Sequence, residues 1–326
     1  MCAGAQEGHN PESVVSTPET FALSDTKDVT TVGAKAEAVE YKGRKAVRLT
    51  KPEGDEAGLA FLNGTQFRDG TIEVDVATKV IAPPGVRRPG FTGIAFRSSD
   101  PAHYELFYLR PGNSKAEDQA MRNHSVQYVS EPGFGWEKLR RQWPFIYESW
   151  ADLQQEEWTN VKIEVRGRHA TLYLNGSPNP SLVVDGLKGD ALQGAVALWS
   201  YSGEESYFSN LRITPAKAEP LENGGEAAGT WEVQCATDAG GFGATLKLVR
   251  QDSTLIGIWS GGLGPDQAVG GVWRDGYVEL SFGGTWPEQP GTVSVTLDGW
   301  IDGGSAKGRV KVEGRAMGRW TAVRQK

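Results

Sequence analysis

The stretch from residue 70 to residue 213 consists of short segments in which apolar and polar side chains alternate. Residues 70–78 are the clearest example, with Ile72, Val74 and Val76 separated by Glu73 and Asp75. A period of two places the apolar side chains on one face of an extended strand. Similar segments occupy residues 91–97, 103–110, 158–166, 169–174, 194–199 and 207–213. The pattern predicts an antiparallel β-sandwich, a fold that usually offers one concave face on which a sugar can lie.

Turn chemistry supports this interpretation. Asn175 and Gly176 follow the segment 169–174, and both residue types accept the positive φ angles of a two-residue turn. We therefore expect a tight hairpin there. Helical periodicity is scarce along the whole chain, which favours an all-β fold.

A second block begins after residues 216–228, which read as a linker because Pro, Gly, Ala and Glu dominate them without any apolar period. Short strand candidates then follow at 230–235, 244–250, 254–260, 268–273, 277–282, 292–300, 305–312 and 318–324. Strands at this rhythm predict an eight-stranded up-and-down β-barrel over residues 229–326, because closure removes exposed sheet edges.

The two ends of this block resemble those of lipocalin- and avidin-like barrels. There an early Trp packs across the base, and an Arg from the last strand covers it. Trp231 stands near the start of this block, and the closing segment 318–324 contains two Arg residues; we expect Trp231 and Trp320 to lie near each other. The many glycines favour close strand packing, so a filled barrel is expected instead of a roomy cavity.

Composition limits the partners. A net charge of −7 with interspersed signs argues against nucleic-acid binding, and no apolar run is long enough to span a membrane. Cys2 and Cys235 are too few for a disulfide framework or a metal cluster. Cys2 has two interpretations: an arbitrary start, or the lipidated cysteine of a bacterial lipoprotein, for which the polar residues 1–19 form a disordered tether. We expect a monomeric protein that is periplasmic, secreted or anchored through Cys2.

The sandwich segment, about residues 20–215, resembles the concanavalin A-like lectin/glucanase superfamily. The likeness rests on the strings FRDGTIEVD, GIAFR, YEL, EWTNVKI, LYLNG and YFSNLRI. Within that superfamily, it is similar to bacterial laminin-G-like domains and to a domain linked to 3-keto-disaccharide hydrolysis. The resemblance implies a jelly-roll β-sandwich and a carbohydrate partner. It does not choose between lectins, hydrolases, lyases and adhesion modules.

Glucanases of this superfamily carry three acids on one strand. Here Glu73 and Asp75 are followed by Ala77 and Thr78, so the third acid is absent. This departure argues against that type of hydrolase. No metal motif is present and no cofactor is expected, although the resemblance allows a structural calcium near Asp100, Asp185 or Asp190.

The segment 110–150 interrupts the strands with polar and aromatic residues that follow no hydrophobic period. Arg and Asn can bind hydroxyl or carboxylate groups, while Trp and Tyr offer stacking surfaces. If the segment is a site, Tyr128, Trp136 or Tyr147 should be partly exposed stacking platforms. With the neighbouring strands, it predicts a glycan-binding set on the concave face. That set is Arg97, Glu105, Tyr108, Arg110, Asn113, Asp118, Arg122, His124, Gln127, Tyr128, Trp136, Arg140 and Tyr147. The alternative is a salt-bridged brace for a long loop.

Alternation along 103–110 divides the candidates. Tyr104, Leu106, Tyr108 and Arg110 share one face, and His103, Glu105, Phe107 and Leu109 share the other. The sequence leaves open which face is concave.

Three hypotheses about function follow. The first is a carbohydrate-binding protein without catalysis. The second is a glycan-degrading hydrolase or lyase with its acid and base among Glu105, His124, Tyr128 and Glu148. The third is an adhesion or scaffold module. The missing third acid places binding first.

Overall fold

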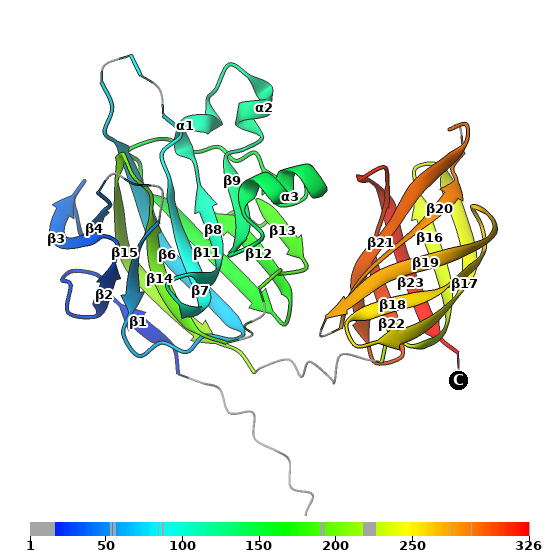
Figure 1. Cartoon of the computed structure of the whole chain (residues 1–326). Helices are drawn as coiled ribbons and strands as arrows, with labels where there is room; N and C mark the ends of the chain where they lie inside the picture. The colour runs from blue at the N-terminus through cyan, green and yellow to red at the C-terminus, as the bar shows by residue number, and fades with distance from the viewer. Residues whose placement is uncertain are drawn as a thin grey trace, which may run out of the picture.

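The chain folds into a two-sheet sandwich followed by a closed β-barrel (Figure 1). The structure, a computed structural model, describes residues 17–325 apart from 53, 55, 56, 84, 87, 190, 192, 218–225, 275 and 288. The all-β prediction is confirmed, including the jelly-roll sandwich and the eight-stranded barrel.

One layer of the sandwich is an eight-stranded antiparallel sheet in the order β13-β12-β11-β6-β15-β4-β3, with β1 paired to β15. Its strands are β1 (Glu19–Phe21), β3 (Lys35–Tyr41), β4 (Arg44–Thr50), β6 (Gly70–Val80), β11 (Thr159–Arg166), β12 (His169–Leu174), β13 (Leu182–Asp185) and β15 (Glu204–Pro215). Ile72, Val74 and Val76 of β6 are buried, as their alternation predicts.

The other layer is a seven-stranded sheet in the order β10-β9-β8-β7-β14-β5-β2. Its strands are β2 (Val29–Val32), β5 (Gly58–Leu62), β7 (Thr92–Asp100), β8 (His103–Leu109), β9 (Val126–Glu131), β10 (Glu148–Ser149) and β14 (Ala195–Ser200). One continuous apolar core fills the space between the two sheets.

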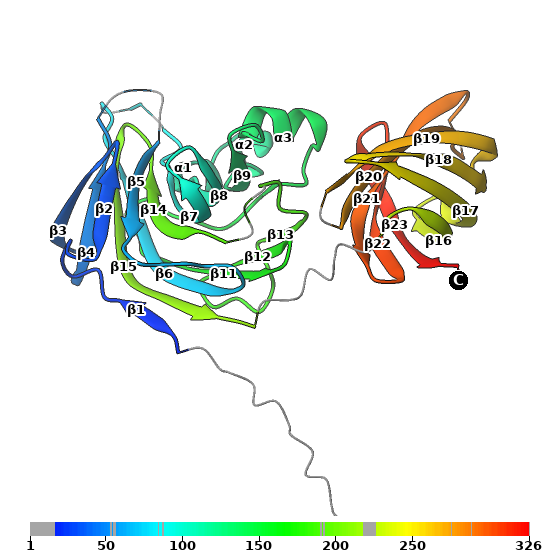
Figure 2. The same ribbon diagram turned by 60° about the horizontal axis from the view of Figure 1, so that its bottom comes forward.

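The segment 110–150 is more regular than its sequence indicates. It contributes β9 and β10 to the seven-stranded sheet and forms the short helices α1 (Pro111–Ser114), α2 (Gln119–Arg122) and α3 (Trp136–Gln142). Figure 2 shows the helices on the side of β7–β9 that faces away from the eight-stranded sheet. The expected insert is therefore partly an extension of the sheet.

The turn at Asn175 and Gly176 has the expected backbone, with φ angles of 51° and 68°. The prediction of a tight hairpin is wrong, however, because the partner strand β13 begins only at Leu182. Residues 177–181 lengthen the connection.

The barrel closes through eight consecutive antiparallel strands, as predicted. They are β16 (Gly229–Thr237), β17 (Gly240–Gln251), β18 (Thr254–Gly261), β19 (Gly264–Arg274), β20 (Tyr277–Thr285), β21 (Thr292–Asp302), β22 (Ser305–Val312) and β23 (Arg315–Arg324). The interior is packed with apolar side chains, including Trp259 stacked on Phe282 at 4.7 Å between ring centroids.

Trp231 is covered as the barrel resemblance implies. The guanidinium carbon of Arg324 lies 5.7 Å from the centroid of its ring, and its indole N–H donates to the carbonyl of Ala227 at 3.0 Å. The prediction that Trp320 lies near Trp231 is wrong. Trp320 pairs with Cys235, four residues further along β16, which is about 13 Å from Trp231 at the rise of a strand.

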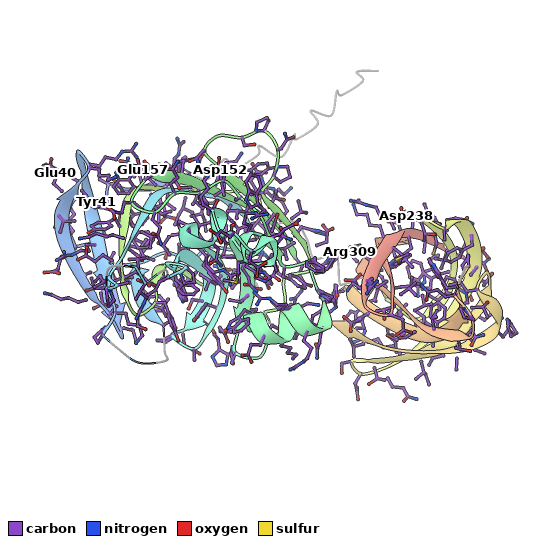
Figure 3. All side chains as sticks on the ribbon, turned by 90° about the horizontal axis from the view of Figure 1, so that it is seen from above. Glu40, Tyr41, Asp152, Glu157, Asp238 and Arg309 are labelled. Atoms are coloured by element: carbon purple, nitrogen blue, oxygen red, sulfur yellow. The ribbon has the colours of Figure 1, made fainter. Side chains whose placement is uncertain are left out.

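The barrel wall packs against the sandwich. The indole N–H of Trp300 on β21 donates to the carbonyl of Asp185 at 3.0 Å, and the Lys188 ammonium donates to the Tyr277 hydroxyl at 3.1 Å. Arg309 of β22 lies on the same wall, on the side that faces the sandwich in Figure 3. This contact buries charged groups that would otherwise be on the outside of a barrel.

Asp298 on β21 is the clearest of these buried charges. It accepts from the Lys311 ammonium at 2.9 Å and the Arg309 guanidinium at 3.2 Å. Asp298 and Lys311 are each about 1% exposed. A buried carboxylate requires such partners, because leaving it unpaired costs several kcal/mol.

Several expectations fall outside the described residues. They concern Cys2, the tether up to residue 16, and residues 218–225 of the linker; Glu19, the last tether residue, already belongs to β1. That the sandwich and the barrel fold independently stays a prediction. Within the described residues, no helix has the length and apolarity needed to cross a membrane.

The packing of Trp231 generates a stability prediction. Trp231→Ala should lower the free energy of unfolding by about 3–5 kcal/mol, because it removes a large buried aromatic and its cation–π partner. Val323→Ala, on the exposed face of the neighbouring strand, is the matched control and should change it by less than about 0.5 kcal/mol. Denaturant unfolding measures both. Equal stability of the two variants would contradict a buried, packed position for Trp231.

Candidate functional site

The predicted set divides between the two faces of the seven-stranded sheet. Glu105 of β8 accepts from the amide N–H of Gly189, which follows β13 of the opposite sheet, so its face points into the sandwich. Tyr108 of β8 therefore points outward, toward the side on which the helices lie. The two groups do not form one site.

Arg97 belongs to the inner group and braces the sandwich. Its backbone lies in the left-handed region, with φ of 51°, at an irregularity in the pairing of β7 with β8. The guanidinium is 1% exposed and contacts Asp69 at 2.9 Å and the carbonyl of Gly167 at 2.6 Å. Burial lowers the pKa of Arg97, an effect that the nearby carboxylates of Glu105 and Asp69 oppose. Asp69 is thus the ion-pair partner of Arg97.

Glu105 is the centre of a second inner network. It accepts from the Tyr128 hydroxyl and, at 2.9 Å, from the amide N–H of Gly189. The amide N–H of Lys188 in turn donates to the Tyr128 oxygen at 2.6 Å. Burial raises the pKa of Glu105, while its hydrogen bond to Tyr128 lowers it. We call Glu105, Tyr128, Lys188 and Gly189 the Glu105 network.

Tyr128 and Tyr147 were expected as partly exposed stacking platforms, and this expectation is wrong. Their exposed fractions are 0% and 1%, and their rings pack together with centroids 5.5 Å apart. Burial raises the pKa of both hydroxyls well above the ordinary value. Both rings support the interior.

The outer group converges on Glu148 of β10. We call it the Glu148 cluster; its members are Tyr108, Arg110, His124, Gln127, Arg140 and Glu148. The strands bring it together, because Gln127 of β9 pairs with Tyr108 on one side and with Glu148 on the other. Arg140 belongs to α3, the helix beside this edge of the sheet.

Three basic side chains surround the Glu148 carboxylate. Arg140 donates to both carboxylate oxygens at 2.8–3.3 Å, the His124 Nδ1 lies 2.8 Å from Oε2, and the Arg110 guanidinium lies 3.6 Å from Oε2. Arg110 also donates to the Gln127 side-chain oxygen, which accepts from the Tyr108 hydroxyl at 3.0 Å. The cluster combines a carboxylate, an imidazole and two guanidinium groups.

The side chains of the Glu148 cluster differ in their exposure to solvent. Glu148 and Arg110 are buried, His124 is 13% exposed at its side chain, and Arg140 is 31% exposed. Burial lowers the pKa of His124, which the carboxylate of Glu148 partly opposes. The imidazole therefore favours its neutral form at neutral pH.

Trp136 lies beside this cluster and is accessible to solvent. Its side chain is 46% exposed, and the Arg140 guanidinium carbon lies 4.8 Å from its ring centroid. Of the three predicted platforms, Trp136 alone keeps an exposed aromatic surface. Phe145 and Trp150, on the segment that follows α3, are exposed as well.

Three other predicted residues organise the loop before β9. Asn113 donates to the carbonyl of His124 at 3.3 Å, and Asp118 caps α2 by accepting from the amide N–H of Ala120 at 2.8 Å. Arg122 donates to the carbonyls of Ala116 and Glu117. These bonds position His124, although none of the three side chains joins the cluster.

The described Asp residues that the sequence analysis considered for catalysis or calcium binding pair with nearby side chains or backbone groups. Asp75 contacts Arg44 at 2.6 Å, Asp100 accepts from the amide N–H of Ala102, and Asp185 lies 3.2 Å from the His169 Nδ1. Asp190 lies outside the described residues. Across the residues that the structure covers, no three His, Cys, Asp or Glu side chains gather as a metal site requires.

Two charged residues of interest, the buried Lys188 and the half-buried Glu131, were missed from the sequence. Lys188 places its ammonium 4.1 Å from the ring centroid of Trp143 and 4.5 Å from that of Tyr277, and burial lowers its pKa to about 8. Glu131 ends β9 and lines a cavity. In the sequence, Lys188 and Glu131 are each a single charged residue near a turn. Such residues are common on protein surfaces, so neither attracted attention.

The brace formed by Arg97 generates the next prediction. Arg97→Met should lower the free energy of unfolding by about 3–5 kcal/mol, because it removes one partner of the buried ion pair between Arg97 and Asp69. Arg44→Met is the matched control; it removes a partly exposed ion pair and should cost about 1 kcal/mol or less. Denaturant unfolding measures both. If Arg97→Met matched the control, Arg97 would not be a brace.

Comparison with solved structures gives distant likenesses. A carbohydrate-binding module, CBM66, from Bacillus subtilis is 15% identical, covering 57% of this chain and 95% of the other, with a TM-score of 0.38. A Bacillus subtilis protein of unknown function with a galectin-like fold is 12% identical, covering 62% and 96%, with a TM-score of 0.43. A putative glycosyl hydrolase from Parabacteroides distasonis is 12% identical, covering 61% and 94%, with a TM-score of 0.38. Such scores assign no activity.

Among curated proteins, none matches the chain significantly. A family model does match, over residues 24–214, which is more than half of the chain and spans the sandwich with its Glu148 cluster. The chain therefore belongs to the family of 3-keto-alpha-glucoside-1,2-lyase-like domains.

Proposed function

We propose that this protein acts on carbohydrates and that the Glu148 cluster is the place where the sugar binds. The observation that carries this proposal is the position of an imidazole–carboxylate pair between two guanidinium groups, beside the half-exposed Trp136. The inner group is less suitable, because Arg97 and Tyr128 are buried in structural contacts.

Trp136 and Arg140 supply the binding chemistry. An exposed indole offers an apolar surface against which the C–H groups of a pyranose ring can pack. Arg140 supplies charged N–H donors for sugar oxygens next to that surface. Together they favour a ring that lies against α3 with its polar edge toward Glu148.

The family description supplies a reaction that these groups suit. In a 3-keto-α-glucoside, the ketone at C3 acidifies the hydrogen at C2. Elimination removes that proton, breaks the bond from C1 to its oxygen substituent and forms a double bond between C1 and C2. The reaction requires a base for the C2 proton, positive charge near the developing enolate oxygen, and a proton for the leaving oxygen.

We assign these roles within the cluster. The pair of His124 and Glu148 accepts the C2 proton, since burial favours the neutral imidazole, and the same pair returns a proton to the leaving oxygen. Arg140, the more exposed guanidinium, stabilises the enolate oxygen, and the buried Arg110 holds Glu148 and Gln127 in place.

Carbohydrate binding without catalysis is the second candidate. One observation favours it: three basic groups already engage the Glu148 carboxylate, an arrangement that also suits a structural ion-pair network. For either function we propose an extracytoplasmic location.

Binding is tested at Trp136. Trp136→Ala should weaken binding of α-glucosides by about 1–3 kcal/mol, because it removes the stacking surface, and should leave the melting temperature almost unchanged. Phe145→Ala, which removes another exposed aromatic of the same segment, is the control and should bind like wild type. Calorimetric titration and thermal melts provide the two readouts. Loss of stability with unchanged binding would identify α3 as a brace.

Catalysis is tested with methyl 3-keto-α-D-glucopyranoside. The product has a double bond conjugated with the ketone, so its ultraviolet absorbance reports turnover. Glu148→Gln should reduce the rate by about 10²–10⁴-fold, the usual contribution of a proton-transfer group. The exposed Glu137→Gln on α3 should retain the wild-type rate.

Two results would contradict the catalytic assignment. One is a Glu148→Gln variant as active as wild type. The other is a wild-type protein that binds α-glucosides without converting the keto sugar, which would leave binding as the function.

A further inference from the structure

A cavity lies at the far end of β8 and β9 from the Glu148 cluster. It measures about 250 Å³. Its polar lining includes Ser99, Tyr104, Ser130 and Glu131, and Phe134 provides an aromatic side. We call it the Glu131 pocket. Its volume lies just below the usual range for sites that hold drug-sized ligands, which suits a single small ring.

Glu131 is the distinctive group of this pocket. Other buried acids of the sandwich have donors: Glu105 has Tyr128 and Gly189, and Glu148 has Arg140. Among the described residues, no donor or cation contacts the Glu131 carboxylate, and burial alone raises its pKa. A half-buried acid without a partner is costly to retain unless a ligand satisfies it.

The chemistry of the pocket suits sugar hydroxyl groups. The two oxygens of one carboxylate can accept from neighbouring hydroxyls of a pyranose, and serine and tyrosine hydroxyls can donate or accept at the remaining positions. Phe134 offers a surface for the C–H face of the same ring. The pocket's two cations, Arg97 and Lys188, already contact Asp69 and Tyr277.

Strand register relates this pocket to the Glu148 cluster. Glu131 and Gln127 alternate on the same face of β9, opposite Tyr104 and Tyr108 of β8. Four residues of strand separate the two places by about 13 Å. One pyranose ring cannot contact both, whereas an oligosaccharide can.

We propose that the Glu131 pocket binds a further ring of the carbohydrate held at the Glu148 cluster, so that the natural ligand is an oligosaccharide. This inference rests on the proposed function. It adds a recognition site and a ligand class, and gives Glu131 a binding role without a role in catalysis.

The test is the dependence of affinity on chain length. Wild type, Glu131→Gln and Ser130→Ala are titrated by calorimetry with methyl α-D-glucopyranoside, maltose, maltotriose and maltotetraose, and with the corresponding cellobiose series. Wild-type affinity should rise about 10-fold or more with length in one series, which equals about 1.4 kcal/mol. Glu131→Gln should bind the single ring like wild type and lose most of that gain.

Controls separate the possible outcomes. Glu137→Gln, an exposed acid on α3, should keep the full gain, and thermal melts show whether each variant is folded. Ser130→Ala should reduce the gain in the same direction and replaces Glu131→Gln if that variant does not fold.

Failure of the inference differs from failure of the proposed function. A wild type that binds single rings as tightly as every longer sugar, or a Glu131→Gln variant that keeps the full gain, would overturn the inference alone. A wild type that binds no sugar of either series would overturn the inference together with the proposed binding function.

Discussion

The buried carboxylate of Glu105 is the constraint on which the sandwich and its contact with the barrel depend. It fixes the Tyr128 hydroxyl and the amide of Gly189, and so ties the seven-stranded sheet to the loop after β13. Glycine is needed at 189, because an added Cβ would lie 2.6 Å from a carboxylate oxygen of Glu105. The same loop presents Lys188 to Tyr277 of the barrel. Leaving such an acid without donors would cost several kcal/mol, which keeps this geometry in place.

The inner and outer faces of the seven-stranded sheet differ in what surrounds them. Residues on the inner face of β8 and β9 hold the two layers together, so their charges are paired and buried. Among the described residues no second sheet covers the outer face, and α3, one of the three short helices on that side (Figure 2), supplies Arg140 and Trp136. The brace and the site were alternatives for one segment. The inner face of these strands holds buried ion pairs and hydrogen bonds that brace the sandwich, and we propose the outer face for the site.

Much of the fold could be predicted from the sequence, because strand alternation and turn residues are local signals. The barrel strands and the φ angles at Asn175 and Gly176 are examples. The two faces of β8 were also predictable, but their direction was not, because it depends on contacts with the distant Gly189. β9 was missed because Gln127, Tyr128 and Ser130 interrupt its apolar pattern, although all three are buried. Glu131 was missed because a strand-ending acid before proline looks like an ordinary surface residue.

Sugar binding on the outer face, at the Glu148 cluster, can be seen in a crystal structure of the full chain with maltotriose. We expect a sugar ring packed on Trp136, with its oxygens within hydrogen-bond distance of Arg140 and Glu148. Sugar density confined to another part of the molecule, such as the mouth of the barrel near Phe242 and Trp286, with the Glu148 cluster left unoccupied, would contradict it.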